Sequence, residues 1–205
     1  MEIVSLVMTP FAENCYVIFD GGEAMVIDPG EPAEELFQAL EGHKVSTLVN
    51  THAHCDHVGG NAEVMRRTGA KLICHEDAAR MLPTAPAQGR MFGMVIEASP
   101  APGQLVAEGD TLKVGNVELK VVDVPGHAPG HIALIGDGFV IGGDVLFAGS
   151  IGRTDIPGGD FDQLMESIRT KLMVLPDDMA VLSGHGPATT IGNERATNPF
   201  ILSTR

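Results

Sequence analysis

The segment that most constrains this chain is residues 51–60, with the sequence THAHCDHVGG, because four of its side chains within six positions can bind a metal. The preceding run VSTLV, residues 45–49, is typical of a buried strand, and the glycines at 59–60 begin the turn into a helix. Side chains at the end of a strand are held more rigidly than side chains on a loop. The segment therefore predicts a metal site at a strand end.

The spacing of the four side chains favours two metals rather than one. His52 and His54 lie two apart on an extended segment and project to the same side, so they can bind one ion. Asp56 and His57 follow after the bend and can begin a second site. Neutral imidazole and carboxylate suit zinc, manganese or iron better than calcium or magnesium. One histidine near a strand end is usually structural, but three histidines and one aspartate together favour metal binding.

Three later motifs repeat one pattern, in which an apolar strand is followed by glycine and then by one ligand-type residue. They end in His127, Asp144 and His185. Glycine lets the backbone bend sharply beside a crowded metal centre. The predicted ligands are His52, His54 and His127 for one metal, Asp56, His57 and His185 for the other, and Asp144 as the bridge between them.

This ligand set is typical of a catalytic site rather than a structural one. Three ligands and a shared carboxylate leave each ion an open position for water. Two ions lower the pKa of the shared water and polarise a substrate carbonyl oxygen, so hydroxide forms near neutral pH. We expect Asp144 and Asp56 to be the catalytic carboxylates, with Asp56 both binding metal and orienting the nucleophile.

Charge and composition exclude several partners. The net charge of −14 argues against nucleic acid and against an anionic membrane surface, but a small anionic substrate needs only a few local cations. No apolar run reaches the ~18 residues of a transmembrane helix, and the first residues do not form a signal peptide. Three cysteines without a CxxC pair fit the reducing cytoplasm. A single domain over residues 1–205 is expected.

Hydrophobic periodicity predicts two sheets packed face to face with helices outside. The stretch 83–104 contains four prolines and is expected to be the least regular part, a loop over the site. The expected strands are 3–8, 15–19, 24–27, 45–50, 71–74, 111–114, 117–124, 131–135, 139–141 and 179–182. The expected helices are 32–40, 61–68, 76–82, the segment after 160–163, and 193–201 with a break at its proline.

The motif HAHCDH followed by the histidines at 127 and 185 and the aspartate at 144, in this order and spacing, resembles the metallo-β-lactamase superfamily. The likeness covers nearly the whole chain. It implies the α+β fold of that superfamily, a four-layered αβ/βα sandwich.

A narrower likeness is to the short, glyoxalase II-like branch, the hydroxyacylglutathione hydrolases. It rests on PGHAPGH at 125–131, GSIGRTD at 149–155, and TTIGNER at 189–195 followed by NPF at 198–200. The resemblance implies two divalent ions and hydrolysis of a thioester, S-lactoylglutathione, to D-lactate and glutathione by a metal-bridging hydroxide. Two-domain members carry a C-terminal helical domain that forms much of the glutathione pocket, so another small thioester, ester or lactone is an alternative substrate.

Other activities of the superfamily fit these residues less well. Persulfide dioxygenases resemble the chain in the GRTD segment at 152–155, and their single iron would be held here by His52, His127 and Asp144. β-Lactam hydrolases usually lack a bridging aspartate at position 144. A metal-binding domain without turnover is disfavoured, because every expected ligand is present.

Three further residues have two interpretations each. Arg153 suits a substrate carboxylate, because a guanidinium forms paired hydrogen bonds with it, or it forms a salt bridge with Asp155 or Asp160. His131 either orients a ligand or packs at a strand start. Cys55 lies between ligands, and alternation points its side chain away from them. Zinc is the expected metal, with iron or manganese as alternatives.

Overall fold

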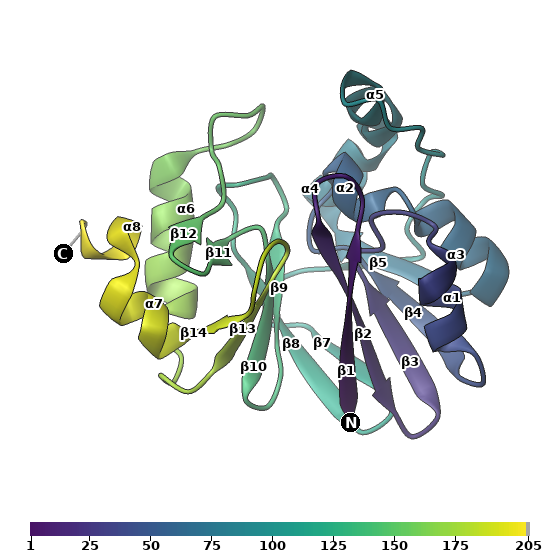
Figure 1. Ribbon diagram of the computed structural model, residues 1–205, viewed down its shortest axis with the longest axis horizontal. Coiled ribbons are helices and arrows are strands. Elements are labelled where there is room, and N and C mark those ends of the chain that lie inside the picture. Colours follow the sequence, from purple (N-terminus) through teal and green to yellow (C-terminus); the bar gives the residue numbers. More distant parts are fainter. Residues whose placement is uncertain (204–205) are drawn as a thin grey trace.

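Two six-stranded sheets face one another in the computed structural model, which describes residues 1–203 (Figure 1). The first sheet has the order β1-β2-β3-β4-β5-β6. Its strands pair antiparallel from β1 to β3 and parallel from β3 to β6. The strand bounds are β1 Glu2–Met8, β2 Glu13–Asp20, β3 Glu23–Ile27, β4 Lys44–Val49, β5 Lys71–His75 and β6 Gln104–Val106.

The second sheet has the order β14-β13-β10-β9-β8-β7. All its neighbouring strands are antiparallel except β10 and β13, which are parallel. Its bounds are β7 Thr111–Val114, β8 Val117–Asp123, β9 Ile132–Ile135, β10 Phe139–Gly143, β13 Ala180–Ser183 and β14 Thr189–Thr190. A small hairpin, β11 Leu146–Phe147 and β12 Ser150–Ile151, follows β10.

Helices cover the outer face of each sheet, with α1 and α3 on the first and α6 and α7 on the second (Figure 1). The fold is therefore the predicted α+β, four-layered αβ/βα sandwich. The helix bounds are α1 Glu34–Leu40, α2 Cys55–Val58, α3 Asn61–Thr68, α4 Glu76–Met81, η1 Leu82–Thr84, α5 Ala85–Met91, α6 Phe161–Ser167, η2 Ile168–Leu172, α7 Ile191–Thr197 and α8 Pro199–Leu202.

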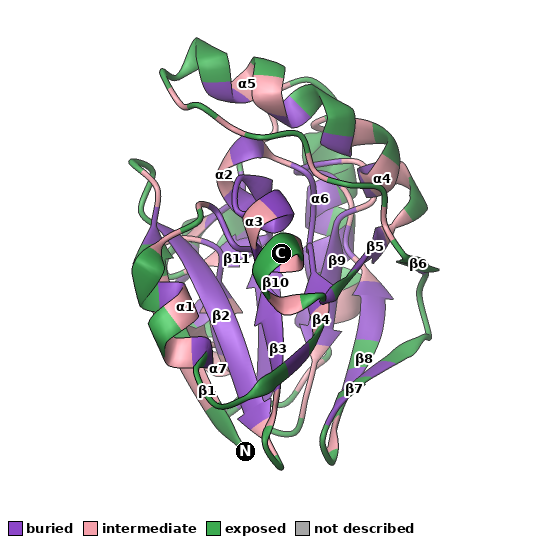
Figure 2. Cartoon of the chain, turned by 90° about the vertical axis from the view of Figure 1, so that its right-hand side faces the viewer, coloured by how far each residue is buried: buried purple, intermediate pink, exposed green. Residues whose placement is uncertain are grey.

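The layers are held by three separate hydrophobic clusters. Alternation along a strand sends neighbouring side chains to different clusters. Val17 packs under the first helices, whereas Ile18 lies between the sheets. The central strands are consequently buried on both faces (Figure 2). Such burial gives the strand ends that carry the predicted ligands a rigid support.

The stretch 83–104 is more regular than predicted, and the expectation of a loop throughout is wrong. Its first part forms η1 and α5, which packs against α2, and only the residues between α5 and β6 are irregular. The prolines mislead here because Pro83 and Pro86 occupy the first turns of η1 and α5. Proline lacks only an amide hydrogen that would find no helical partner at that position.

The ends of several other elements differ from the prediction by a few residues. The one-turn helix α2 begins at Cys55, before the glycines expected to start a helix. The terminal helix is divided into α7 and α8 at Asn198, next to the predicted break at Pro199. Among residues 1–203, no helix combines the length and apolarity required to cross a membrane.

Candidate metal centre

The predicted ligands of the first half lie on the connection that leaves β4. This connection bends at Thr51 and His52, is extended at His54, the N-terminal cap of α2, and then closes into one helical turn. The turn sends Asp56 and His57 in a direction different from that of His52 and His54. One strand end thus carries two pairs of candidate ligands.

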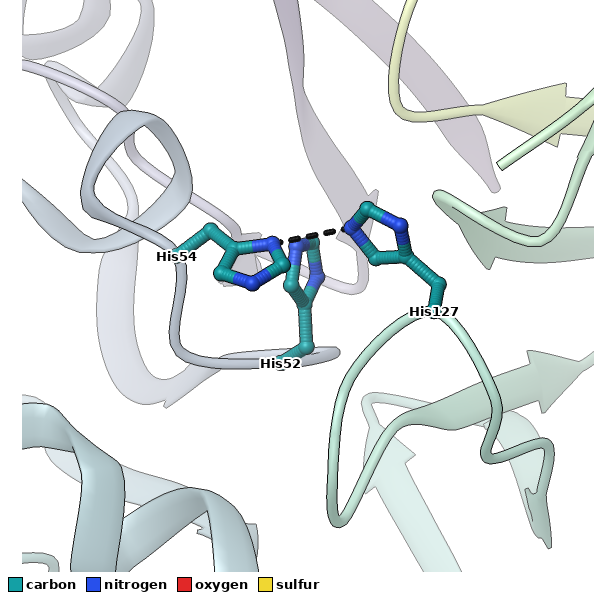
Figure 3. Close-up of side chains that lie close together, drawn as sticks. All are labelled: His52, His54 and His127. Atoms are coloured by element: carbon teal, nitrogen blue, oxygen red, sulfur yellow. Dashed lines mark hydrogen bonds between the residues drawn. The ribbon is translucent and has the colours of Figure 1, made fainter. Parts of the chain in front are cut away.

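His52, His54 and His127 form one triad, with one nitrogen from each ring lying within 4.8 Å of the others (Figure 3). His54 Nδ1 and His127 Nε2 are 2.8 Å apart. His127 reaches the triad from the loop between β8 and β9, on the opposite sheet. We call this triad subsite 1.

In two of the three rings of subsite 1, the nitrogen that faces away from the triad is a hydrogen-bond donor. His127 Nδ1 donates to the carbonyl of Arg153 at 2.8 Å. The hydroxyl of Thr51 donates its one proton to Asp28, so it accepts from His52 Nδ1 at 3.0 Å. In the described part of the chain, the buried Nε2 of His52 has no hydrogen-bond partner. The lone pairs of His52 and His127 therefore face the centre of the triad, where a cation fits.

Asp56, His57 and His185 form a second triad, subsite 2. His185 Nε2 lies 3.3 Å from His57 Nε2 and 3.4 Å from Asp56 Oδ2. The outer nitrogens are again engaged, because His57 Nδ1 donates to Asp28 at 3.2 Å and His185 Nδ1 donates to the carbonyl of Phe11 at 3.0 Å. When these rings are neutral, each inner nitrogen therefore presents a lone pair, as in histidines that bind metal.

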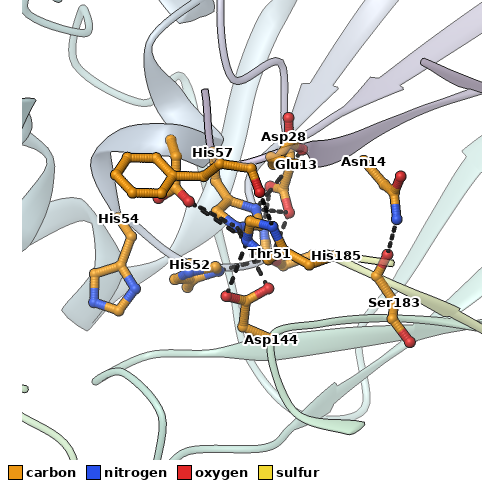
Figure 4. A network of polar contacts seen from close by, with 12 residues as sticks. Glu13, Asn14, Asp28, Thr51, His52, His54, His57, Asp144, Ser183 and His185 are labelled. Carbon is orange, nitrogen blue, oxygen red and sulfur yellow. Dashed lines mark hydrogen bonds and ion pairs between the residues drawn. The ribbon is translucent and has the colours of Figure 1, made fainter. Parts of the chain in front are cut away.

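Asp144 lies between the two triads (Figure 4). Its Oδ1 is 3.4 Å from His57 Nε2, and its Oδ2 is 3.4 Å from His185 Nε2 and 3.5 Å from His127 Nε2. It follows Gly143 at the end of β10, where the backbone takes a left-handed φ of 52°. A side chain at Gly184 would overlap the Asp144 carboxylate. These two glycines allow the aspartate to enter the centre.

The ionisation of these groups matches a site for cations. Burial raises the pKa of Asp144, but attraction from His57 and hydrogen bonds from His185 and His57 bring it well below its ordinary value. Burial, together with nearby His127, lowers the pKa of His54 to about 4, so this ring stays neutral. Burial opposes protonation of His185, but hydrogen bonds with Asp144 and Asp56 raise its pKa to about 10. Subsite 2 thus attracts positive charge, which a metal ion can supply instead of a proton.

The three residues with open interpretations now have definite positions. The guanidinium of Arg153 is exposed and forms paired bonds of 2.8 and 3.0 Å with Asp155, and only its carbonyl contacts the centre. His131 stacks on His52 at 4.6 Å between ring centroids and accepts the backbone N–H of Asp144 at 3.1 Å. Cys55 is buried in the cluster beneath the first helices.

Residues around the ligands that sequence reasoning missed include Asp28, Thr51 and Asn14. Asp28 has a φ of 50° and accepts from the backbone N–H and the hydroxyl of Thr51 as well as from His57. The sequence carries a signal for Asp28, because this aspartate follows the end of a strand directly, as several candidate ligands do, and precedes Pro29 and Gly30. Asn14 contacts residues far away in the chain and leaves no local signal.

A family model for the metallo-β-lactamase superfamily matches residues 8–185. The chain belongs to this superfamily, and it is a metallohydrolase whose clustered histidines and aspartates indicate divalent metal ions. It is similar to hydroxyacylglutathione hydrolase GloC of Haemophilus influenzae, with 39% identity over 210 residues that cover 99% of each chain.

Solved structures with the same fold include two at 34% identity. BLEG-1, a B3 metallo-β-lactamase, superposes with a TM-score of 0.91 and covers 98% of this chain and 99% of its own. TTHA1623, solved in a di-iron-bound form, has a TM-score of 0.89 and covers 96% of this chain and 99% of its own. The glyoxalase II-like resemblance of the sequence is confirmed by the relative from Haemophilus influenzae.

Proposed function

We propose that the protein is a binuclear, metal-dependent hydrolase of a small thioester, with S-lactoylglutathione as the substrate and D-lactate and glutathione as the products. One observation carries the proposal: two triads of ligand atoms converge on either side of one carboxylate, Asp144. The name of GloC, a hydroxyacylglutathione hydrolase, supports the choice of substrate.

The proposed ligands follow from the inward lone pairs. Subsite 1 would hold one ion and subsite 2 the other, with Asp144 shared by both. Zinc suits imidazole and carboxylate ligands, and the di-iron form of TTHA1623 supports iron as the alternative. Because both subsites combine residues from the two sheets, residues 1–205 are proposed to act as one catalytic domain. The three buried free cysteines support a reducing, cytoplasmic compartment.

Two cations would lower the pKa of a shared water molecule and polarise the thioester carbonyl. Asp56 Oδ2 lies 3.4 Å from His185 Nε2, at the edge of subsite 2, where its carboxylate can orient the attacking water and accept its proton. Asp144 would keep the two positive charges at a fixed separation. The leaving group needs little acid assistance, because a thiol has a pKa near about 8.5.

Arg153 is the proposed substrate-binding cation. Its carbonyl holds His127, so the residue borders subsite 1, and its exposed guanidinium is free to exchange Asp155 for a substrate carboxylate. A surface ion pair contributes only about 0–1 kcal/mol, so the exchange costs little. A glutathione conjugate carries carboxylates that would suit this fork.

The experiment is hydrolysis of S-lactoylglutathione by protein stripped of metal and reloaded separately with zinc, manganese or iron. The proposal predicts metal-dependent turnover with kcat/KM on the order of 10⁴ M⁻¹s⁻¹ or more. Full metal occupancy without turnover would reject the substrate and direct the search to other thioesters, esters or lactones.

Two other activities belong in the same assay. The 34% identity to BLEG-1 favours β-lactam hydrolysis as a second candidate, tested with a chromogenic cephalosporin. Oxygen consumption with glutathione persulfide tests the single-iron dioxygenase. A single ion on His52, His127 and Asp144 would leave the second triad, Asp56, His57 and His185, without a metal ion, so the number of bound ions also separates the two activities.

A further inference from the structure

The loop that carries His185 is bonded to the opposite sheet by several hydrogen bonds. The backbone N–H of Asn14 donates to Gly184 O at 2.7 Å, and Glu13 forms a β-bridge with His185. The carbonyl of Phe11 accepts from the His185 ring. The first turn and start of β2 therefore align the last ligand in the chain.

The side chain of Asn14 supplies the most specific part of this contact. Its Nδ2 donates to Ser183 O and to Gly186 O, both at 2.9 Å, so one amide group binds the carbonyls on either side of His185. The hydroxyl of Tyr16 donates to the same Ser183 carbonyl at 2.7 Å. Asn14 and Tyr16 are both buried. Only the NH₂ of the amide can serve two carbonyl acceptors, which fixes its orientation.

Subsite 1 has a separate connection between the sheets. The backbone N–H of Ile132 donates to Thr51 O at 2.8 Å and joins the start of β9 to the residue before His52. His127 is held in addition by the Arg153 carbonyl. Neither connection involves residues 183–186. The two subsites are consequently assembled by two independent contacts between the sheets.

We propose that Asn14, supported by Tyr16, is a positioning residue for His185 that selectively determines the affinity of subsite 2 for its ion. This inference rests on the proposed pair of metal ions. The Asn14 amide acts on His185 through the backbone, by holding the carbonyl two residues before it, Ser183 O, and the carbonyl of the residue after it, Gly186 O. Loss of the amide leaves Gly186 O without its donor and Ser183 O with the Tyr16 hydroxyl alone. The loop is loosened, so His185 Nε2 is no longer held firmly in its place opposite His57.

Aspartate at position 14 is the most informative change, because it keeps the size of the side chain and replaces the two donors by an acceptor that faces two carbonyls. Tyr16→Phe removes one donor from the same carbonyl and leaves the amide in place. Thr68→Val is the matched control, because it removes a hydroxyl-to-carbonyl bond within α3, remote from the metal centre.

The test is titration of each metal-free variant with zinc against a chromophoric chelator, with the melting temperature and circular dichroism recorded. Residues that orient a metal ligand are typically worth 10–100-fold in affinity, so Asn14→Asp should raise the Kd of one of the two ions by about that factor. The other ion should stay within about twofold, and Tyr16→Phe should give a smaller loss of the same ion. Thr68→Val should bind both ions like the wild type.

Anomalous diffraction at the zinc edge should find the ion that Asn14→Asp retains at His52, His54 and His127. Two ions bound with wild-type affinities, or a parallel loss of both, would overturn the role of Asn14 while leaving the two-metal proposal intact. A wild-type protein that takes up one ion overturns both. If Asn14→Asp does not fold, Tyr16→Phe is measured instead, and a weaker affinity for one ion alone is again the expected result.

Discussion

His57 Nε2 and His185 Nε2 face one another at 3.3 Å although they come from opposite sheets. The outer nitrogen of each ring is bonded, to Asp28 and to the carbonyl of Phe11. Two lone pairs pointed at each other repel unless a proton or a cation lies between them. Without metal a proton can take this place, since the pKa of His185 is raised to about 10, and we propose that a metal ion replaces it in the loaded protein.

Replacement of Asp144 by alanine should abolish binuclear occupancy. The carboxylate approaches His57, His127 and His185, so its loss removes the group shared by the two triads. Elemental analysis should find at most one ion per chain, and kcat should fall by more than the about 10–100-fold typical of residues that only support a ligand. Asp137→Ala, in the turn after β9, is the control. Two retained ions with full activity would contradict the bridging role.

Gly184→Ala should damage the centre without replacing a proposed ligand. A methyl group at 184 would overlap the Asp144 carboxylate and approach the His57 ring. We expect the same loss of metal and turnover as for a ligand variant. Gly142→Ala offers a close comparison, because a methyl group there meets nothing within 4 Å. Equal metal content in Gly184→Ala and Gly142→Ala would argue against a close approach of residue 184 to the Asp144 carboxylate.

Arg153→Ala should raise KM for S-lactoylglutathione by about tenfold, the equivalent of roughly 1.4 kcal/mol, with kcat and metal content unchanged. The guanidinium is exposed, and the carbonyl that holds His127 is retained in the variant. Arg169→Ala, which removes a surface ion pair with Glu166, is the control. Unchanged KM in both variants would leave Arg153 as a partner of Asp155 alone.

Glu194 predicts an acid-dependent loss of stability. The buried carboxylate of Glu194 accepts hydrogen bonds from Thr189, Asn198 and the N–H of Gly149. Burial raises the pKa of Glu194, but these hydrogen bonds lower it by more, so the net shift is downward. A lowered pKa contributes stability above the ordinary value of about 4.3 and loses it as the pH falls through the folded-state pKa.

The corresponding variant is Glu194→Gln. Hydrogen bonds to a charged group contribute about 1.5–3 kcal/mol each, so we expect a lower free energy of unfolding at pH 7 by about that amount or more. The difference from wild type should shrink towards pH 3 in urea denaturation at matched metal content. A difference that does not depend on pH would show that packing, not charge, is lost.

The candidate ligands can be picked from the sequence because they follow strands that are recognisable by themselves. Val49 ends β4 before His52, and Gly143 ends β10 before Asp144, so local patterns determine both the strands and the residues at their ends. The continuous apolar runs of β2 and β10 likewise predict burial on both faces and hence the layers.

The groups that orient the ligands were beyond local patterns. Asn14 contacts Ser183 across 169 positions of the chain, and this contact exists only after the two sheets have docked. Asp28 was visible at the end of a strand, but its three bonds depend on Thr51 and His57 being brought alongside. The helix α5 is hidden in the sequence because proline usually indicates a loop, whereas the first turn of a helix tolerates it.

The central claim is that two cations bind on either side of Asp144, and anomalous diffraction from zinc-loaded crystals tests it most directly. The account predicts two peaks, one among His52, His54 and His127 and one among Asp56, His57 and His185, with Asp144 contacting both. A single peak held by His52, His127 and Asp144, with subsite 2 empty at saturating metal, would contradict it.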